Sequence, residues 1–167
     1  EIFRQWKVSE DFLYLLLRSC GLLEPTNDLD QSKLKDFLQA GRTQALSFLY
    51  QSWLSSTVLN DLRLLPGLEF EGKWVNDPLL PRQLLVDILR GLNEGTWYSI
   101  SSLVAEIHEK RPDFQRYAGE YESWFIRRKG EETYLSGFEH WDDVEGELLR
   151  NLLTGPLHWF GILDLAS

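Results

Sequence analysis

Two segments carry hydrophobic residues at the spacing of an amphipathic helix. After Thr43, apolar side chains fall at i, i+3, i+4, i+7 and i+8, and these are Leu46, Leu49, Tyr50, Trp53 and Leu54. A second stripe begins near Pro81, a residue suited to a first helical turn; it consists of Leu80, Leu84, Leu85, Ile88, Leu89 and Leu92. Because this spacing places side chains on one helical face, each stripe predicts a helix with one buried side.

Helix-terminating residues predict the remaining elements of the first half. Ser9 offers an N-cap and Gly21 a C-terminal stop, so a helix is expected between them. A short helix is expected over residues 31–39, and Thr43 is placed to cap the helix that follows it. Residues 57–78 are rich in Asn, Asp, Pro and Gly, which predicts a connector made of turns.

The second half predicts two further helices. Ser99 can cap a helix that ends at Pro112, and a final helix is expected from about Asp142 to Leu153, where Asp142 and Glu145 have the spacing of a capping box. The inward faces of the helices after residue 80 predict a common core of Leu84, Leu85, Ile88, Leu103, Val104, Ile107, Leu148, Leu149 and Leu152.

Short extended segments separate the helices. A hairpin is expected in which residues 124–126 return through 133–135, around a turn at 129–132. Residues 97–98 are expected to form a short extended link and residues 159–165 a turn and a strand. Residues 2–6 also look extended, and we expect them to pair with residues 160–165, because an unpaired strand exposes its backbone groups.

The predicted fold class is mainly α with small β elements (α+β), in two parts. Residues 1–75 form an N-terminal helical segment, interpreted as the tail of an upstream winged-helix-like unit plus a connector. Residues 76–167 form a winged-helix-like domain with an insertion at about 111–139. The order helix, short strand, helix, insertion, helix, strand is that of a winged helix, whose third helix is normally the recognition element.

Composition places the chain among globular proteins. Hydrophobic residues make up 43% of its 167 residues and charged residues 26%, values that are ordinary for a packed domain. The single cysteine, Cys20, excludes an internal disulfide and favours a reducing compartment. No apolar run is long enough to span a bilayer, so we expect a cytoplasmic protein with no membrane partner. The sequence contains no methionine, and we expect it to be a piece of a longer chain.

The charge is strongly acidic but unevenly distributed. The net charge is −9, whereas residues 110–130 carry six basic side chains against three acidic ones. A direct DNA-binding domain would use the basic, aromatic-flanked patch at 110–129. Its candidate nucleic-acid-binding residues are Lys110, Arg111, Arg116, Arg127, Arg128 and Lys129. The predicted last helix instead carries four carboxylates, which repel phosphate.

A set of scattered motifs resembles a known family. The motifs are Trp97-Tyr98-Ser99-Ile100, Trp124-Phe125-Ile126-Arg127, Phe138-Glu139 with Trp141, Leu148-Leu149-Arg150 and Gly155-Pro156-Leu157-His158-Trp159-Phe160-Gly161. They look like bacterial helicase-associated proteins that are similar to the N-terminal domain of XPB-type DNA helicases. The resemblance covers most of the chain and implies winged-helix folds and an association with repair or transcription machinery.

No catalytic or cofactor-binding motif accompanies these features. There is no phosphate-binding loop for a helicase motor, no nucleophile elbow, and no standard metal-ligand spacing around His108, His140 or His158. We therefore expect no enzyme, no cofactor and no small-molecule substrate. The sequence predicts a non-catalytic interaction module with mainly a protein partner, and direct DNA binding through the 110–129 patch is the alternative.

Overall fold

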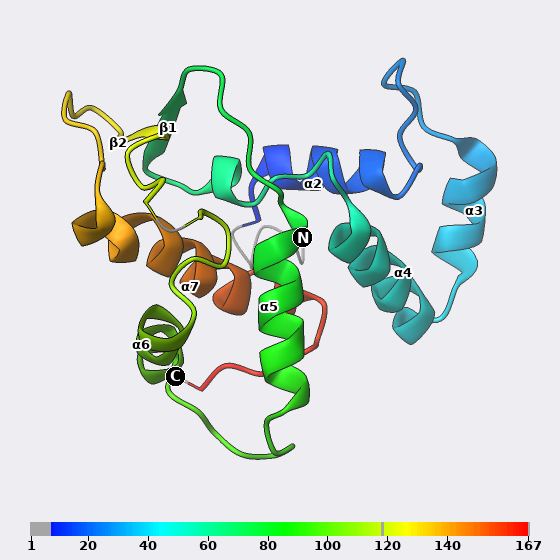
Figure 1. The fold of residues 1–167 in the computed structure, drawn as a ribbon. Coiled ribbons are helices and arrows are strands. Elements are labelled where there is room, and N and C mark those ends of the chain that lie inside the picture. The colour runs from blue at the N-terminus through cyan, green and yellow to red at the C-terminus, as the bar shows by residue number, and fades with distance from the viewer. Residues whose placement is uncertain (1–7, 118, 167) are drawn as a thin grey trace. The chain divides into compact units, whose positions relative to one another are not determined.

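The computed structural model of the chain describes residues 8–117 and 119–166 (Figure 1). These residues divide into two compact units, one made of residues 8–60 and 154–166 and the other of residues 61–117 and 119–153. The structure is mainly α-helical with one small antiparallel sheet, as the sequence predicted. The boundaries between units fall at 60/61 and 153/154, whereas the sequence suggested a single boundary at 75/76.

The first unit contains four helices within its described residues. They are α2 (Glu10–Ser19), α3 (Gln31–Gln39), α4 (Arg42–Ser55) and the short α8 (Pro156–Trp159). The Ser9 side chain accepts a hydrogen bond from the backbone N–H of Phe12, which confirms the predicted cap, and Gly21 has the positive φ of 66° that a helix stop favours. Helix α4 begins after Gly41 rather than at a Thr43 cap.

The interior of the first unit contains both aromatic rings and leucine side chains. The ring of Phe160 packs 5.7 Å from that of Trp53 and 6.1 Å from that of Tyr50, and Trp159 meets Phe12 edge-on at 5.2 Å. Cys20 is buried. The segment after residue 154 is thus tied to α2 and α4 by side-chain packing.

The second unit contains three longer helices and the sheet. Helices α5 (Leu79–Arg90), α6 (Ile100–Lys110) and α7 (Glu147–Thr154) follow one another, with β1 (Leu68–Glu71) before α5 and β2 (Phe125–Arg128) between α6 and α7. Helix α7 ends at the unit boundary. Two 3₁₀ turns, η1 (Leu62–Leu64) and η2 (Phe138–His140), and a π-helical turn, η3 (Asp142–Gly146), complete the unit.

The sheet pairs two distant segments. Strands β1 and β2 lie side by side (Figure 1) and are antiparallel. In their register Glu69 is opposite Arg127 and Phe70 is opposite Ile126. The predicted hairpin is present as a shorter feature: Arg127 forms an isolated bridge with Tyr134, and the Leu135 N–H donates to the Ile126 carbonyl. Strand β1 lies in the region that was predicted to be connector alone, so this part of the prediction was wrong.

The start of the last helix differs from the prediction. The Ser99 cap on α6 is present, because its Oγ accepts from the Ser102 N–H. Asp142 and Glu145, however, do not form a capping box: the chain passes from η2 into the π-turn η3, and Glu145 points into the interior. The wider π-turn accommodates a carboxylate that has a buried partner from another segment.

Two predicted strands are not formed. Residues 97–98 have no strand assignment, and residues 160–166 form turns and irregular structure after α8. The proposed partner segment, residues 2–6, lies outside the described residues. Because residues 160–166 form no strand, they leave no strand edge that would need a partner.

The predicted core of the second unit is largely confirmed. Seven of its nine residues are buried, while Ile88 and Leu103 are half-buried. Leu80, placed in the buried stripe of α5, is 39% exposed because it lies in the first turn of the helix. Besides apolar residues, this interior contains the ion pair of Arg82 with Asp61, whose side chains are 0% and 3% exposed.

Candidate functional site

The most buried member of the predicted basic patch is Arg116. Its guanidinium donates through Nε to Glu145 Oε1 at 2.5 Å and through Nη2 to Glu145 Oε2 at 2.6 Å. Both side chains are almost fully buried, and the Gln115 amide donates to the same carboxylate. Arg116 therefore joins the 113–124 segment to η3, and its charge is neutralised by a fixed partner.

Three more of the six cations are paired with carboxylates. Arg127 contacts Glu69 at 2.8 Å and Glu71 at 2.9 Å across the sheet. Arg128 pairs with Asp143, and Lys110 with Glu106 at 2.7 Å along α6. The Lys110 ammonium donates a hydrogen bond to the Glu106 carboxylate, and this bond lowers the pKa of Glu106.

The remaining two cations, Arg111 and Lys129, are exposed. Neither has a carboxylate partner in the part of the chain that the structure describes. Their backbones end α6 and follow β2, respectively. The six residues thus do not form one uniform surface, and only these two present uncompensated charge.

A stack of rings and cations runs through the second unit. The Arg63 guanidinium lies 4.2 Å from the Trp74 ring centre, and Trp74 stacks on Trp124 at 4.6 Å with 11° between the planes. Arg116 lies 4.9 Å from Trp124 and 4.6 Å from the ring of Tyr121. Cations over aromatic faces are attracted by the ring quadrupole, so this stack joins η1 and the turn after β1 to the segment that carries Arg116, Tyr121 and Trp124.

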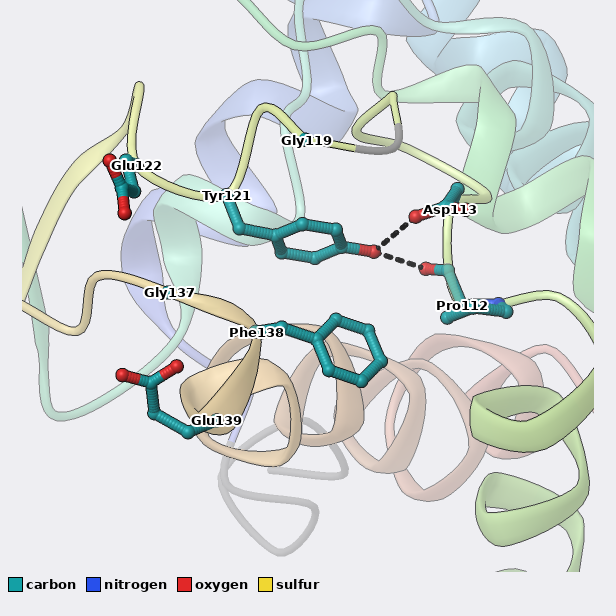
Figure 2. Close-up of a pocket in the computed structure, with 8 residues that line it drawn as sticks. All are labelled: Pro112, Asp113, Gly119, Tyr121, Glu122, Gly137, Phe138 and Glu139. Carbon is teal, nitrogen blue, oxygen red and sulfur yellow. Dashed lines mark hydrogen bonds between the residues drawn. The ribbon is translucent and has the colours of Figure 1, made fainter.

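A pocket of about 420 Å³ opens beside the last ring of this stack (Figure 2). Figure 2 shows the Tyr121 hydroxyl directed at Asp113 and Pro112, with the Phe138 ring beside it. The hydroxyl donates to Asp113 Oδ1 at 2.7 Å, and the Pro112 carbonyl lies at 3.1 Å. Burial, and then the Asp113 hydrogen bond, raise the pKa of Tyr121, so it is a neutral donor at ordinary pH. The full lining is Pro112, Asp113, Gly119, Tyr121, Glu122, Gly137, Phe138 and Glu139.

The histidines have structural contacts. His108 stacks on Trp141 at 4.5 Å and on Phe138 at 5.2 Å. The His140 ring Nδ1 lies 3.0 Å from Asp143, and that of His158 lies 3.2 Å from the Leu163 carbonyl. Across residues 8–117 and 119–166, no three His, Cys, Asp or Glu side chains are grouped in a way that would hold a metal ion.

Large aromatic side chains are exposed on the second unit. Tyr117 is 80% exposed and Trp97 67%, and Tyr98, Phe125, Tyr134 and Phe138 are also exposed. Tyr98 accepts a hydrogen bond from the Asn93 N–H, which ties the α5–α6 loop that carries Trp97. Trp and Tyr are enriched in protein interfaces because they bury a large area with few rotatable bonds.

Sequence reasoning missed the pocket and the buried ion pairs. The acidic lining comes from three short segments, and the partner of Arg116 lies 29 residues further along the chain. Two features of the sequence were available as signals of this site. Residues 113–139 are rich in aromatic side chains, and after residue 130 Glu exceeds Lys and Arg. Neither indicates which carboxylates converge.

Comparisons with known protein families, with curated proteins and with solved structures find no match to this chain. Among the described residues, no helix has the length and apolar character needed to cross a membrane.

Proposed function

We propose that this chain is a non-catalytic interaction module of the winged-helix type that binds mainly a protein partner. The observation that carries the proposal is a contrast in the second unit. Four of the six cations in the 110–129 patch are paired with carboxylates, while large rings such as Trp97 and Tyr117 are exposed. A nucleic-acid interface needs the reverse, because its affinity comes from cations that neutralise phosphates.

The proposed setting is a helicase-associated protein of the repair or transcription machinery. Its support is the resemblance of the Trp97, Trp124 and Gly155 motifs to bacterial proteins similar to the N-terminal domain of XPB-type helicases. The succession α5, α6, α7 matches the three helices of a winged helix in order. The carboxylates of η3 and the start of α7 support a protein partner for the third helix, because they disfavour the major groove.

A photo-crosslinking residue in place of Trp97 tests the proposal in extracts of the native cells, after nuclease treatment. A matched substitution at Tyr14, which is 41% exposed on the first unit, is the control. We expect one discrete protein adduct from position 97, suppressed by excess unmodified chain, and none from position 14. No adduct from position 97, or equal adducts from both positions, would contradict the proposal.

The alternative function is direct DNA binding through Arg111 and Lys129, the two patch cations without carboxylate partners among the described residues. Fluorescence anisotropy with a short labelled duplex separates the two functions. A protein-binding module should show weak binding at low salt that is lost at physiological salt. Tight binding at physiological salt that Arg111→Ala and Lys129→Ala together abolish would favour DNA instead.

A further inference from the structure

Every charged side chain that lines the pocket beside Tyr121 is acidic. Its lining includes the carboxylates of Asp113, Glu122 and Glu139 and contains no lysine or arginine. Asp113 accepts the Tyr121 hydroxyl, whereas Glu122 and Glu139 make no ion pair within the described part of the chain. The carboxylate of Glu139 folds back against Gly137, at a place that a Cβ would occupy. The absence of a side chain at Gly137 therefore lets this charge reach the pocket.

Arg116 does not cancel this charge. It lies behind the Tyr121 ring, 4.6 Å from its centre, but its Nε and Nη2 are bound to Glu145. His108 stacks on the Phe138 ring and is not among the lining residues. The exposed Arg111 precedes the lining residue Pro112 in the chain, so three lining carboxylates stand against one cation adjacent in sequence, and the net charge is negative.

Two aromatic rings supply the apolar part of the wall. Tyr121 and Phe138 meet at 5.1 Å with their planes 89° apart, so they form a corner (Figure 2). The Phe138 side chain is 46% exposed although it is large and apolar. A ring beside carboxylates is the environment that attracts an organic cation: the π face and the charges act together, and the apolar stem of the ligand covers the ring.

We propose that this pocket receives a basic side chain, arginine in preference to lysine, from the protein partner of the chain. The inference rests on the proposed function, because it names the chemistry of that partner. A guanidinium fits better than an ammonium, since its planar face can lie on a ring while its edge donates to carboxylates. Metal ions are disfavoured because the described carboxylates do not converge as a ligand set.

A titration of the full chain with a small cationic probe tests this inference without the natural partner. The probe is the blocked tripeptide Gly-Arg-Gly, and the matched control probe carries citrulline, which keeps the shape and removes the charge. The reporters are the backbone amide signals of Gly119 and Gly137, which line the pocket. We expect saturable shifts of both signals with the arginine peptide, smaller shifts with a lysine peptide, and none with the citrulline peptide.

Variants of the chain locate the binding. Glu139→Gln and Phe138→Leu should each weaken the arginine peptide about two- to five-fold, the range of an exposed ion pair or cation–π contact. Glu94→Gln removes the same charge from the exposed α5–α6 loop and should leave affinity unchanged. Equal weakening by Glu94→Gln and Glu139→Gln, or equal shifts from the citrulline peptide, would overturn the inference.

The outcomes for the pocket and for the proposed function are distinguishable. If the peptide fails to shift Gly119 and Gly137 while position 97 still crosslinks to a protein, the chain binds a protein through another surface. If the peptide binds and no adduct forms from position 97, the pocket is an arginine site and the proposed module is wrong about its partner surface.

Discussion

The two units of this chain are stabilised by different chemistry. In the first unit the ring of Phe12 packs on Trp159 and that of Trp53 on Phe160, and its described residues contain no buried ion pair of the kind that Arg116 forms with Glu145. The second unit contains two buried ion pairs and a stack of alternating cations and rings. Apolar packing tolerates approximate geometry, whereas a buried ion pair stabilises only when its partners are in place. The second unit is therefore the more specifically assembled of the two.

The largest expected effect tests the apolar side of this comparison. Trp53 is fully buried against Phe160, so Trp53→Ala should lower the free energy of unfolding by about 3–5 kcal/mol. Trp97→Ala, which removes the same side chain from an exposed loop, should change it by less than about 0.5 kcal/mol. Urea unfolding measures both, and a small loss for Trp53→Ala would mean that rings do not close the first unit.

The second prediction tests the charged side. Glu145→Gln leaves Arg116 buried without its counter-charge, and should cost about 3 kcal/mol. Replacing both members, as Arg116→Met with Glu145→Leu, removes the uncompensated charge and should recover most of that loss. Urea unfolding of the single and double variants checks this rescue. A double variant as unstable as Glu145→Gln would contradict this prediction, because it would show that apolar side chains cannot replace the ion pair at this site.

The same contrast explains which parts of the fold the sequence predicted. The helices α2, α3, α5 and α6 follow from caps and apolar spacing, which are local signals. Strand β1 was missed because its pairing with β2 comes from a distant segment and its own four residues are flanked by turn residues. Local pattern assigns elements well where packing is apolar, and less well where a long-range partner decides the conformation.

The candidate site shows the same limit. The patch at 110–129 was found from charge alone, and charge in sequence does not reveal that Glu69 lies opposite Arg127 or that Glu145 turns inward. The π-turn contains Glu145, whose partner Arg116 lies in the insertion at about 111–139, for which the sequence predicted only a short hairpin. Ion pairs with carboxylates neutralise four of the six cations in this patch.

A smaller effect is expected at the outer end of the stack. Arg63 lies over Trp74 and also donates through Nη2 to the Trp74 carbonyl at 2.9 Å. Arg63→Gln should lower the free energy of unfolding by about 1 kcal/mol, because the contact is at an exposed site. Arg90→Gln, which removes an exposed arginine from the end of α5, is the control and should change stability by less than about 0.5 kcal/mol. Equal losses for the two variants would show that the stack contributes nothing beyond surface charge.

An effect of similar size at neutral pH, which shrinks as the pH rises, is expected for the hydroxyl at the inner end of the stack. Tyr121→Phe removes the hydrogen bonds to Asp113 and Pro112, and should cost about 1 kcal/mol near neutral pH. Burial, together with the Asp113 carboxylate, raises the pKa of Tyr121 in the folded chain, so the tyrosine ionises more readily when the chain is unfolded. Its contribution to stability is therefore complete below the ordinary tyrosine pKa of about 10 and declines as the pH rises above it. The difference in unfolding free energy between the parent chain and Tyr121→Phe should therefore shrink between about pH 9 and pH 11. Urea unfolding at each pH measures it. The other tyrosines ionise in both chains, so the difference reports on Tyr121 alone. A difference that stays constant over this range would mean that the surroundings do not hold the hydroxyl neutral. The charged contacts that distinguish the second unit would then not include those of the Tyr121 hydroxyl at the pocket.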